Sequence, residues 1–235
     1  GIDGVQSHTR TLWRLLDLYR IPVFLFITKM DFARRSREDL MAELQRELSP
    51  NCLDFRREYV HCHKEQLAMC REDVLESYLQ TGEVTTEDVS SLIVSRSVFP
   101  CYFGSGLKLE GIDEFLSGIE TYTTQKQYAE AFGAKVFKIT YDEQNTRLTH
   151  LKITGGSLRV RDSVTDGKGE SKITQIRLYS GSKHVAVDEV AAGDVCCVVG
   201  LDSTQNGQGI GTEAMSGAPV LEPIMKYRIV LPKDC

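Results

Sequence analysis

The sequence predicts two kinds of fold in one chain: an α/β region of parallel strands with helices, followed by an all-β barrel domain. Up to about residue 126, two continuous apolar runs alternate with segments of helical periodicity. From about residue 130, short strand-like runs are separated by Gly, Asp and Asn, a spacing that is typical of a barrel or a sandwich. The change of pattern predicts a domain boundary near residue 130.

The α/β region is predicted from helical periodicity and from two buried strands. Periodicity and capping residues such as Ser36 predict helices over five ranges: residues 6–20, 37–48, 54–80, 86–95 and 110–122. In the last helix we expect four apolar side chains to face inward: Ile112, Phe115, Leu116 and Ile119. The runs VFLFI and VFPCYFG predict strands at residues 23–27 and 98–104. Strands that alternate with helices indicate a parallel sheet, although two strands are fewer than a complete doubly wound domain contains.

The all-β region is predicted from six short runs that are rich in β-branched and aromatic residues. They occupy residues 134–142, 146–154, 163–166, 171–180, 184–190 and 194–200. A polar loop is expected at residues 203–218, and PIMKYRIVLP predicts one more strand that stands alone at the end.

The composition restricts the class of protein. Hydrophobic residues make up 41% and charged residues 26% of the chain, as in an ordinary soluble globular protein. No apolar run approaches the ~20 residues that span a bilayer, and no signal peptide opens the chain, so we expect a cytoplasmic protein without a membrane partner. The seven cysteines form no C-x-x-C pair, which indicates reduced thiols. The adjacent His61, Cys62 and His63 do not converge with Cys70 on one ion, so no metal site is predicted.

Two loops at strand ends carry the candidate chemistry. The first strand runs into Thr28-Lys29-Met30-Asp31. A carboxylate accepts both donors on one edge of guanine, and a Lys two residues earlier can lay its methylene stem along the purine face. The second strand ends in Ser105-Gly106-Leu107, where small residues let backbone N–H groups approach a base. Open α/β sheets bind ligands at this end of their strands, so the two loops together predict a guanine pocket.

These loops and their surroundings resemble translational GTPases of the elongation factor G type, particularly the tetracycline-resistance ribosomal protection proteins. DGVQSHTRTLWRLLDLYRIPVFLFITKMD resembles the segment that follows the second switch of that family. FGSGLKLEGIDEFL resembles its last guanine loop and final helix, and KVFKITYDEQNTRLTHLKITGGSLRVRDSV resembles its second domain, a β-barrel. The resemblance implies the C-terminal part of a GTP-binding domain at residues 1–126, barrel domain II at 130–221 and the start of a third domain at 222–235.

The resemblance also implies a ligand, a partner and a set of site residues. GTP or GDP would be bound through its base, and the partner would be the ribosome, with its RNA and proteins, rather than DNA. The implied base-binding residues are Thr28, Lys29, Asp31, Ser105, Gly106 and Leu107. The family's N-K-x-D has Asn where this chain has Thr28, and a hydroxyl makes fewer loop bonds than an amide, which implies weaker nucleotide binding. The family's S-A-x-K becomes Ser105-Gly106-Leu107-Lys108, a change that keeps the backbone donor.

Two family motifs do not occur in these 235 residues: G-x-x-x-x-G-K-[ST] and D-x-P-G-H. The first cradles the phosphates and ligates magnesium, and the second holds the second switch. We therefore predict neither a catalytic residue nor a magnesium ligand in this chain. We expect a fragment of a ribosome-associated GTPase that hydrolyses no GTP by itself.

One alternative is a non-catalytic module that binds the ribosome or RNA, and another is a non-functional remnant. Residues 131–200 carry 10 Lys and Arg against 8 Asp and Glu, which is compatible with a surface that faces nucleic acid. Six basic residues could contact phosphates: Arg147, Lys152, Arg159, Arg161, Lys172 and Arg177.

Overall fold

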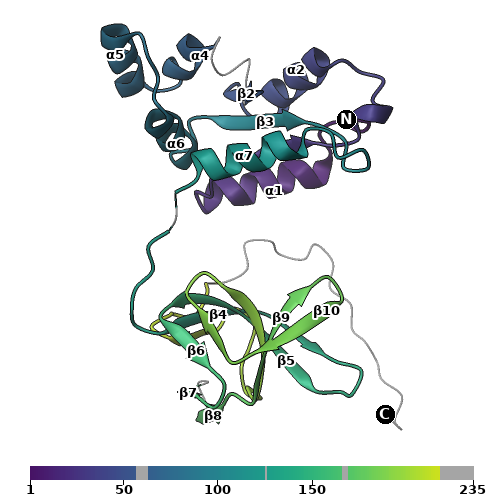
Figure 1. Cartoon of the computed structure of the whole chain (residues 1–235), viewed down its shortest axis with the longest axis vertical. Helices are drawn as coiled ribbons and strands as arrows, with labels where there is room; N and C mark the ends of the chain where they lie inside the picture. The colour runs from purple at the N-terminus through teal and green to yellow at the C-terminus, as the bar shows by residue number, and fades with distance from the viewer. Residues whose placement is uncertain (57–62, 125, 166–168, 218–235) are drawn as a thin grey trace. The chain divides into compact units, whose positions relative to one another are not determined.

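The computed structural model describes residues 1–56, 63–124, 126–165 and 169–217. The chain divides into two compact units, an α/β unit over residues 1–125 and a β unit that begins at Lys126 (Figure 1). The strand predicted near the C-terminus, and with it the predicted third domain at 222–235, lies outside the described residues. In the described part of the chain, no helix is long and apolar enough to cross a membrane.

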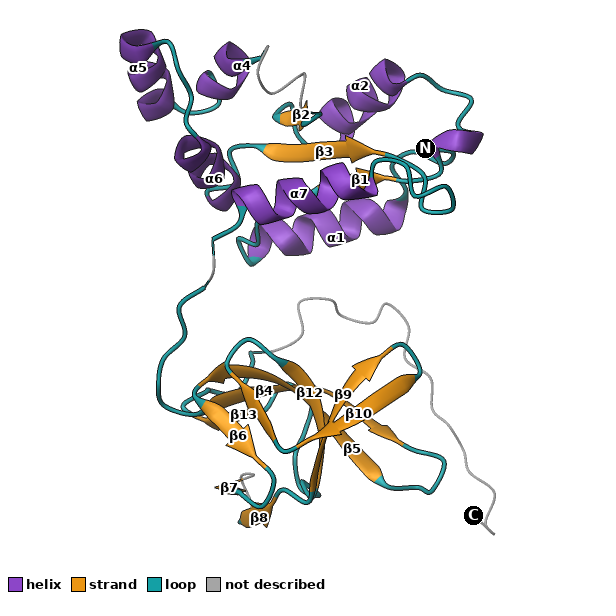
Figure 2. Cartoon of the chain, viewed as in Figure 1, coloured by secondary structure: helices purple, strands orange, loops and turns teal. Residues whose placement is uncertain are grey.

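The α/β unit is a small parallel sheet flanked by helices, as the sequence predicts (Figure 2). Its strands are β1 (Leu25–Ile27), β2 (Cys52–Asp54) and β3 (Phe99–Phe103), in the order β1-β3-β2. Its helices are α1 (Ser7–Leu18), α2 (Arg37–Glu47), α4 (Lys64–Ala68), α5 (Glu72–Thr81), α6 (Thr86–Val94) and α7 (Ile112–Tyr122). Both outer strands run parallel to β3, so all three carboxyl ends lie at one edge of the sheet.

The two faces of this sheet bury alternate residues of β3 in two separate cores. Phe99, Cys101 and Phe103 pack on the face that α1 and α2 cover, through Trp13 and Leu44 among others. Tyr102 packs on the opposite face with residues of α4, α5, α6 and α7. A strand that is buried on both faces explains the continuous apolar run in the sequence.

Helix starts agree with the predicted capping, since the Ser36 hydroxyl and the Asp39 carboxylate form a capping box at α2. The predicted helix over residues 54–80 is wrong at its start, where Asp54 ends the three-residue strand β2. The expected inward position of Leu116 is also wrong, because this side chain is 55% exposed. Gly118 sets the rotation of α7: a Cβ there would lie 1.9 Å from the Tyr102 hydroxyl, so the backbone itself packs on that ring.

The β unit is built around one six-stranded antiparallel sheet in the order β10-β9-β12-β5-β4-β13. These strands are β4 (Gly133–Tyr141), β5 (Arg147–Gly155), β9 (Gln175–Ser180), β10 (Lys183–Val187), β12 (Val195–Val199) and β13 (Gly209–Gly211). Two small sheets pair β6 (Ser157–Arg159) with β11 (Glu189–Ala191) and β7 (Ser163–Thr165) with β8 (Glu170–Lys172). The all-β prediction is confirmed, whereas the described strands form several sheets rather than one closed, hydrogen-bonded barrel.

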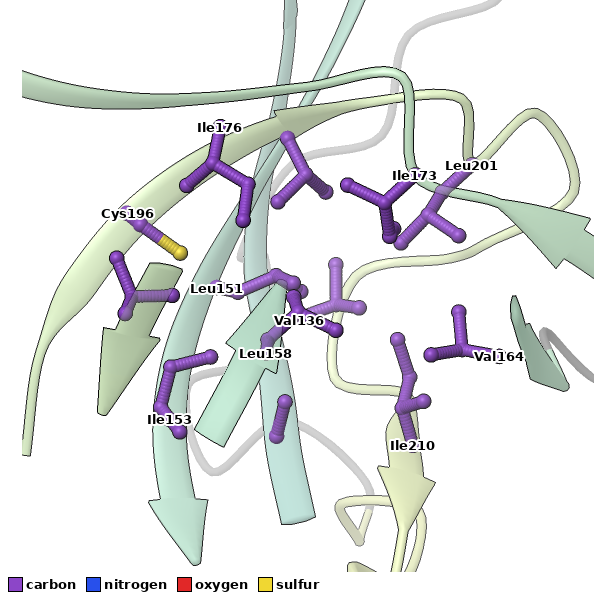
Figure 3. Packing of buried hydrophobic residues seen from close by; sticks show 13 residues of the cluster. Val136, Leu151, Ile153, Leu158, Val164, Ile173, Ile176, Cys196, Leu201 and Ile210 are labelled. Carbon is purple, nitrogen blue, oxygen red and sulfur yellow. The ribbon is translucent and has the colours of Figure 1, made fainter. Parts of the chain in front are cut away.

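These sheets enclose a single apolar core, in which side chains from different strands converge (Figure 3). Val136, Leu151 and Ile176 come from the main sheet, and Leu158 and Val164 come from the small sheets. The predicted polar loop at 203–218 contains the short strand β13, whose Ile210 is 2% exposed and completes this core.

We expect the α/β unit to unfold before the β unit, since its sheet has three short strands and α1 has no fully buried residue. Among the described residues, β1 pairs only with β3 and leaves its other edge open. Trp13 is the single tryptophan and packs on Phe99, with ring centroids 4.6 Å apart, so its fluorescence reports on the α/β unit alone. In a urea titration, Trp13 emission should change before the NMR amide resonances of β5 and β12 lose their native chemical shifts. Coincident transitions by both probes would contradict the expectation.

Candidate functional site

The candidate site lies at the sheet edge where β1 and β3 end side by side. Ile27 and Phe103, the last residues of these parallel strands, are paired in register. The segments that follow them, residues 28–32 and 104–110, therefore leave the sheet next to each other. This edge is where the sequence predicts a ligand pocket.

Backbone hydrogen bonds join the two loops directly. The Gly104 N–H donates to the Ile27 carbonyl at 3.0 Å, and the Met30 N–H donates to the Gly104 carbonyl at 3.1 Å. Lys29 adopts a left-handed conformation, with φ of 59°, and Met30–Phe32 form one 3-10 turn. This turn directs the backbone away from the strand and places Asp31 on the side of the second loop.

The second loop is closed by its own hydrogen bonds. The Ser105 N–H donates to the Glu110 carbonyl at 3.0 Å, the Glu110 N–H donates back at 3.1 Å, and the Lys108 N–H donates to the Ser105 hydroxyl at 3.3 Å. Ser105 is 1% exposed, so its hydroxyl stabilises the loop from the buried side. A Cβ on Gly104 would lie 2.1 Å from the Glu110 carbonyl oxygen, so this position requires glycine. Gly106 has open space beside its Cα, which leaves room for a ligand atom.

Between the loops lies a cavity of about 530 Å³. All six residues that the sequence singles out line it: Thr28, Lys29, Asp31, Ser105, Gly106 and Leu107. Ile2 and Phe32 complete the lining. Three apolar members are exposed, Ile2 by 46%, Phe32 by 63% and Leu107 by 82%, although each belongs to the wall of a cavity. Such a wall suits a flat ring that presents a polar edge and two apolar faces.

Asp31 is the acidic residue among those that line this cavity. Both of its carboxylate oxygens are buried, and neither accepts a hydrogen bond within the described part of the chain. A buried acceptor without a donor costs about 1–3 kcal/mol, and native proteins retain few of them. The carboxylate is therefore suited to a ligand that brings two adjacent donors.

Sequence reasoning missed Ile2 and Phe32. Phe32 follows Asp31 directly, and a large apolar residue beside a polar loop is the signal that could have identified it. Nothing in the sequence distinguishes Ile2, because its place at the cavity depends on how the chain before α1 lies against the end of β1.

Four of the six basic residues considered for phosphate contacts are engaged within the β unit. The Arg147 guanidinium donates to the Thr204 carbonyl, the Lys152 ammonium donates to the Gly193 carbonyl, and Arg159 and Arg177 pair with Glu189 and Asp142 at 3.1 and 3.3 Å. These contacts reduce the capacity of the four side chains to bind phosphate. Among the described residues, no group of His, Cys, Asp and Glu could hold a metal ion, and His61 and Cys62 lie outside that part of the chain.

Each of the two units matches the model of a known protein family. Residues 1–125 match the family model of the elongation factor Tu GTP binding domain, and residues 131–213 match elongation factor G domain 2. The chain is similar to the tetracycline resistance protein TetP of Clostridium perfringens, at 24% identity over 97% of this chain and 39% of TetP. It is also similar to elongation factor G of Amoebophilus asiaticus, at 22% identity over 97% of this chain and 43% of that protein.

The fold has a counterpart among solved structures. The crystal structure of ttk003000868 from Thermus thermophilus matches with a TM-score of 0.80 at 18% identity, over 94% of this chain and 42% of that chain. The chain thus spans about two fifths of the length of the relatives it matches. Two family matches in this order cover both units, and the first covers more than half of the chain, so the protein belongs to the translational GTPase family, with an elongation factor Tu GTP binding domain followed by elongation factor G domain 2.

Proposed function

We propose that the cavity between the two loops binds the guanine base of GTP or GDP, as part of a ribosome-associated translational GTPase. The observation that carries this proposal is the Asp31 carboxylate: it is buried, it has no donor among the described residues, and Asp31 lines the cavity shared with the second loop. The GTP binding domain family supplies the nucleotide class.

The groups around the cavity complement the polar edge and the two faces of guanine. The Asp31 carboxylate accepts from the ring N1–H and the exocyclic amine of guanine, whereas adenine offers no such pair of donors. The Lys29 methylene stem and the Leu107 side chain can cover the two faces of the ring. The Ser105 N–H already donates to the Glu110 carbonyl, so the backbone N–H groups of Gly106 and Leu107 are the ones that can approach the base from the other side, where Gly106 leaves open space.

The proposal assigns base recognition to this chain and no phosphate chemistry. The phosphate-loop motif does not occur in the 235-residue sequence, so the groups that we propose for this chain are those that orient the base. We propose that the β unit docks on the ribosome and that the protein acts in translation in the cytoplasm. The relatives named as elongation factor G and as tetracycline resistance proteins support translation elongation and tetracycline resistance as its two candidate roles.

Base recognition is tested with the 235-residue chain itself. Saturation-transfer NMR should show that the base proton of GDP contacts the chain. Guanosine should displace GDP, because the nucleoside keeps every group that the cavity is proposed to bind. Adenosine serves as the matched competitor and should displace GDP far less. Displacement by both nucleosides alike, or no transfer to GDP at millimolar concentration, would overturn the proposal.

A further inference from the structure

One face of the six-stranded sheet carries a row of four aromatic rings. The row crosses the sheet from Phe137 of β4 through His150 of β5 and Tyr179 of β9 to His184 of β10. Successive ring centroids are 6.0, 6.2 and 5.1 Å apart, and neighbouring planes are tilted by 55°, 42° and 40°. The rings therefore form one continuous aromatic row rather than isolated contacts.

Strand register explains how rings from four strands reach one row. Tyr179 pairs with His184 across the β9–β10 hairpin, and His150 pairs with Cys197 of β12. Cys197 is small and fully buried, and the His150 and Tyr179 ring centroids lie 6.2 Å apart although β12 lies between their strands. A register shift between Val136 and Lys138 marks a β-bulge at Phe137, and bulges of this kind redirect a side chain.

The aromatic row lies outside the apolar core. The core of the β unit takes the alternate residues of the same strands, among them Leu151 and Ile176. Phe137 remains 49% exposed and Tyr179 41% exposed, and His184 is exposed as well. Large rings at the surface of a sheet contribute little to the core, so their alignment points to an external ligand.

An exposed cation lies beside the row. Lys138 is exposed and pairs with His150 across the strands, whereas Arg177, which pairs with Cys197, is engaged by the Asp142 carboxylate. The His150 Nε2 lies 2.8 Å from the Thr140 hydroxyl, which fixes the ring. Burial and the nearby Lys138 ammonium lower the pKa of His150, so its ring is neutral at pH 7 and presents an uncharged face.

We propose that the aromatic row binds unpaired bases of single-stranded RNA, with Lys138 beside the phosphates. Every base has a flat face that can stack on Phe, Tyr or His, and bases in single strands are free to do so, whereas those in a duplex are not. The proposal deepens the ribosome-docking part of the proposed function. It involves none of the residues of the guanine cavity, so the two can fail separately.

Fluorescence anisotropy of a labelled single-stranded oligo(A) of about 12 nucleotides, with the full chain, tests this proposal within the usual range of site sizes. The double variant F137A/Y179A should bind roughly tenfold or more weakly, because each lost stack weakens binding severalfold or more. K138A should weaken binding modestly and reduce its salt dependence. The same strand in a duplex with its complement should bind more weakly than the single strand.

Two controls make the result specific. Tyr141→Ala removes a ring of β4 that is 59% exposed but makes none of the three contacts of the row, so RNA affinity should not change. An Asp31→Asn chain should bind RNA as the wild type does. Unaltered thermal unfolding shows that F137A/Y179A is folded. Equal RNA affinity of F137A/Y179A and wild type, equal loss in Tyr141→Ala, or no binding of oligo(A) at all would overturn the proposal.

Discussion

Asp31→Asn should move the base preference of the cavity from guanine toward xanthine. In the proposed pocket the Asp31 carboxylate accepts from two guanine donors, whereas an amide keeps one acceptor and replaces the other with a donor. That donor opposes the exocyclic amine of guanine but matches the C2 carbonyl of xanthine. Loss of a charge-assisted partner in a buried polar site costs about 2–5 kcal/mol, which corresponds to a roughly thirtyfold or larger loss of guanine affinity. Competition of guanosine and xanthosine in the NMR experiment measures the ratio directly.

Thr28→Asn is the matched control for this change. Thr28 lines the same cavity, and in the proposed pocket it supports the loop rather than the edge of the base. An amide makes more loop hydrogen bonds than a hydroxyl, so Thr28→Asn should tighten guanosine and xanthosine together and leave their ratio unchanged. If Asp31→Asn leaves that ratio at its wild-type value, the Asp31 loop is only a turn and the assignment of a guanine pocket is wrong.

Gly104→Ala should destabilise the α/β unit, whereas Gly106→Ala, two residues along the same loop, should not. The new Cβ at position 104 would lie 2.1 Å from the Glu110 carbonyl oxygen and 2.8 Å from the Phe26 ring, so the loop must move away from β1. Overpacking of this kind costs about 1–3 kcal/mol. The urea midpoint of the Trp13 fluorescence transition measures this loss.

Gly106 is the control because a Cβ there meets nothing within 4 Å. Its φ is not in the left-handed region, so Gly106→Ala should leave the midpoint unchanged or raise it slightly by restricting the unfolded chain. Gly104→Ala should also weaken guanosine binding, because the Gly104 carbonyl accepts the hydrogen bond that holds the first loop. Equal midpoints for the two variants would show that the loop yields to a Cβ at 104 and does not depend on that glycine.

The elements that the sequence predicts correctly are those whose signal is local. Ser36 and Asp39 determine the start of α2 through their own side chains, and the apolar run that contains β3 follows from burial on both faces. That the loops after β1 and β3 lie side by side is also predictable, since parallel strands bring their carboxyl ends to one edge, whereas the role of their residues in binding a base stays a prediction.

The features that the sequence does not predict depend on distant contacts. β2 has three residues and is a strand only because β3 pairs with it, and the rotation of α7 depends on the Tyr102 ring against Gly118. The small sheet of β6 with β11 joins segments that are far apart in the chain, and no local pattern indicates that these two strands pair. The aromatic row cannot be predicted from the sequence for the same reason. Phe137 on β4 and Tyr179 on β9 belong to one row only because β5 and β12 lie between their strands in the folded sheet.

The hydrogen bond from the Met30 N–H to the Gly104 carbonyl has a consequence for motion. The loop that carries Asp31 cannot separate from the loop that carries Ser105 without exposing this amide to solvent. The rate of deuterium uptake at the Met30 amide therefore measures how often the two loops separate and the cavity opens. A ligand that contacts both loops should slow deuterium uptake at the Met30 amide, whereas a ligand that contacts a single loop should leave the exchange rate nearly unaltered.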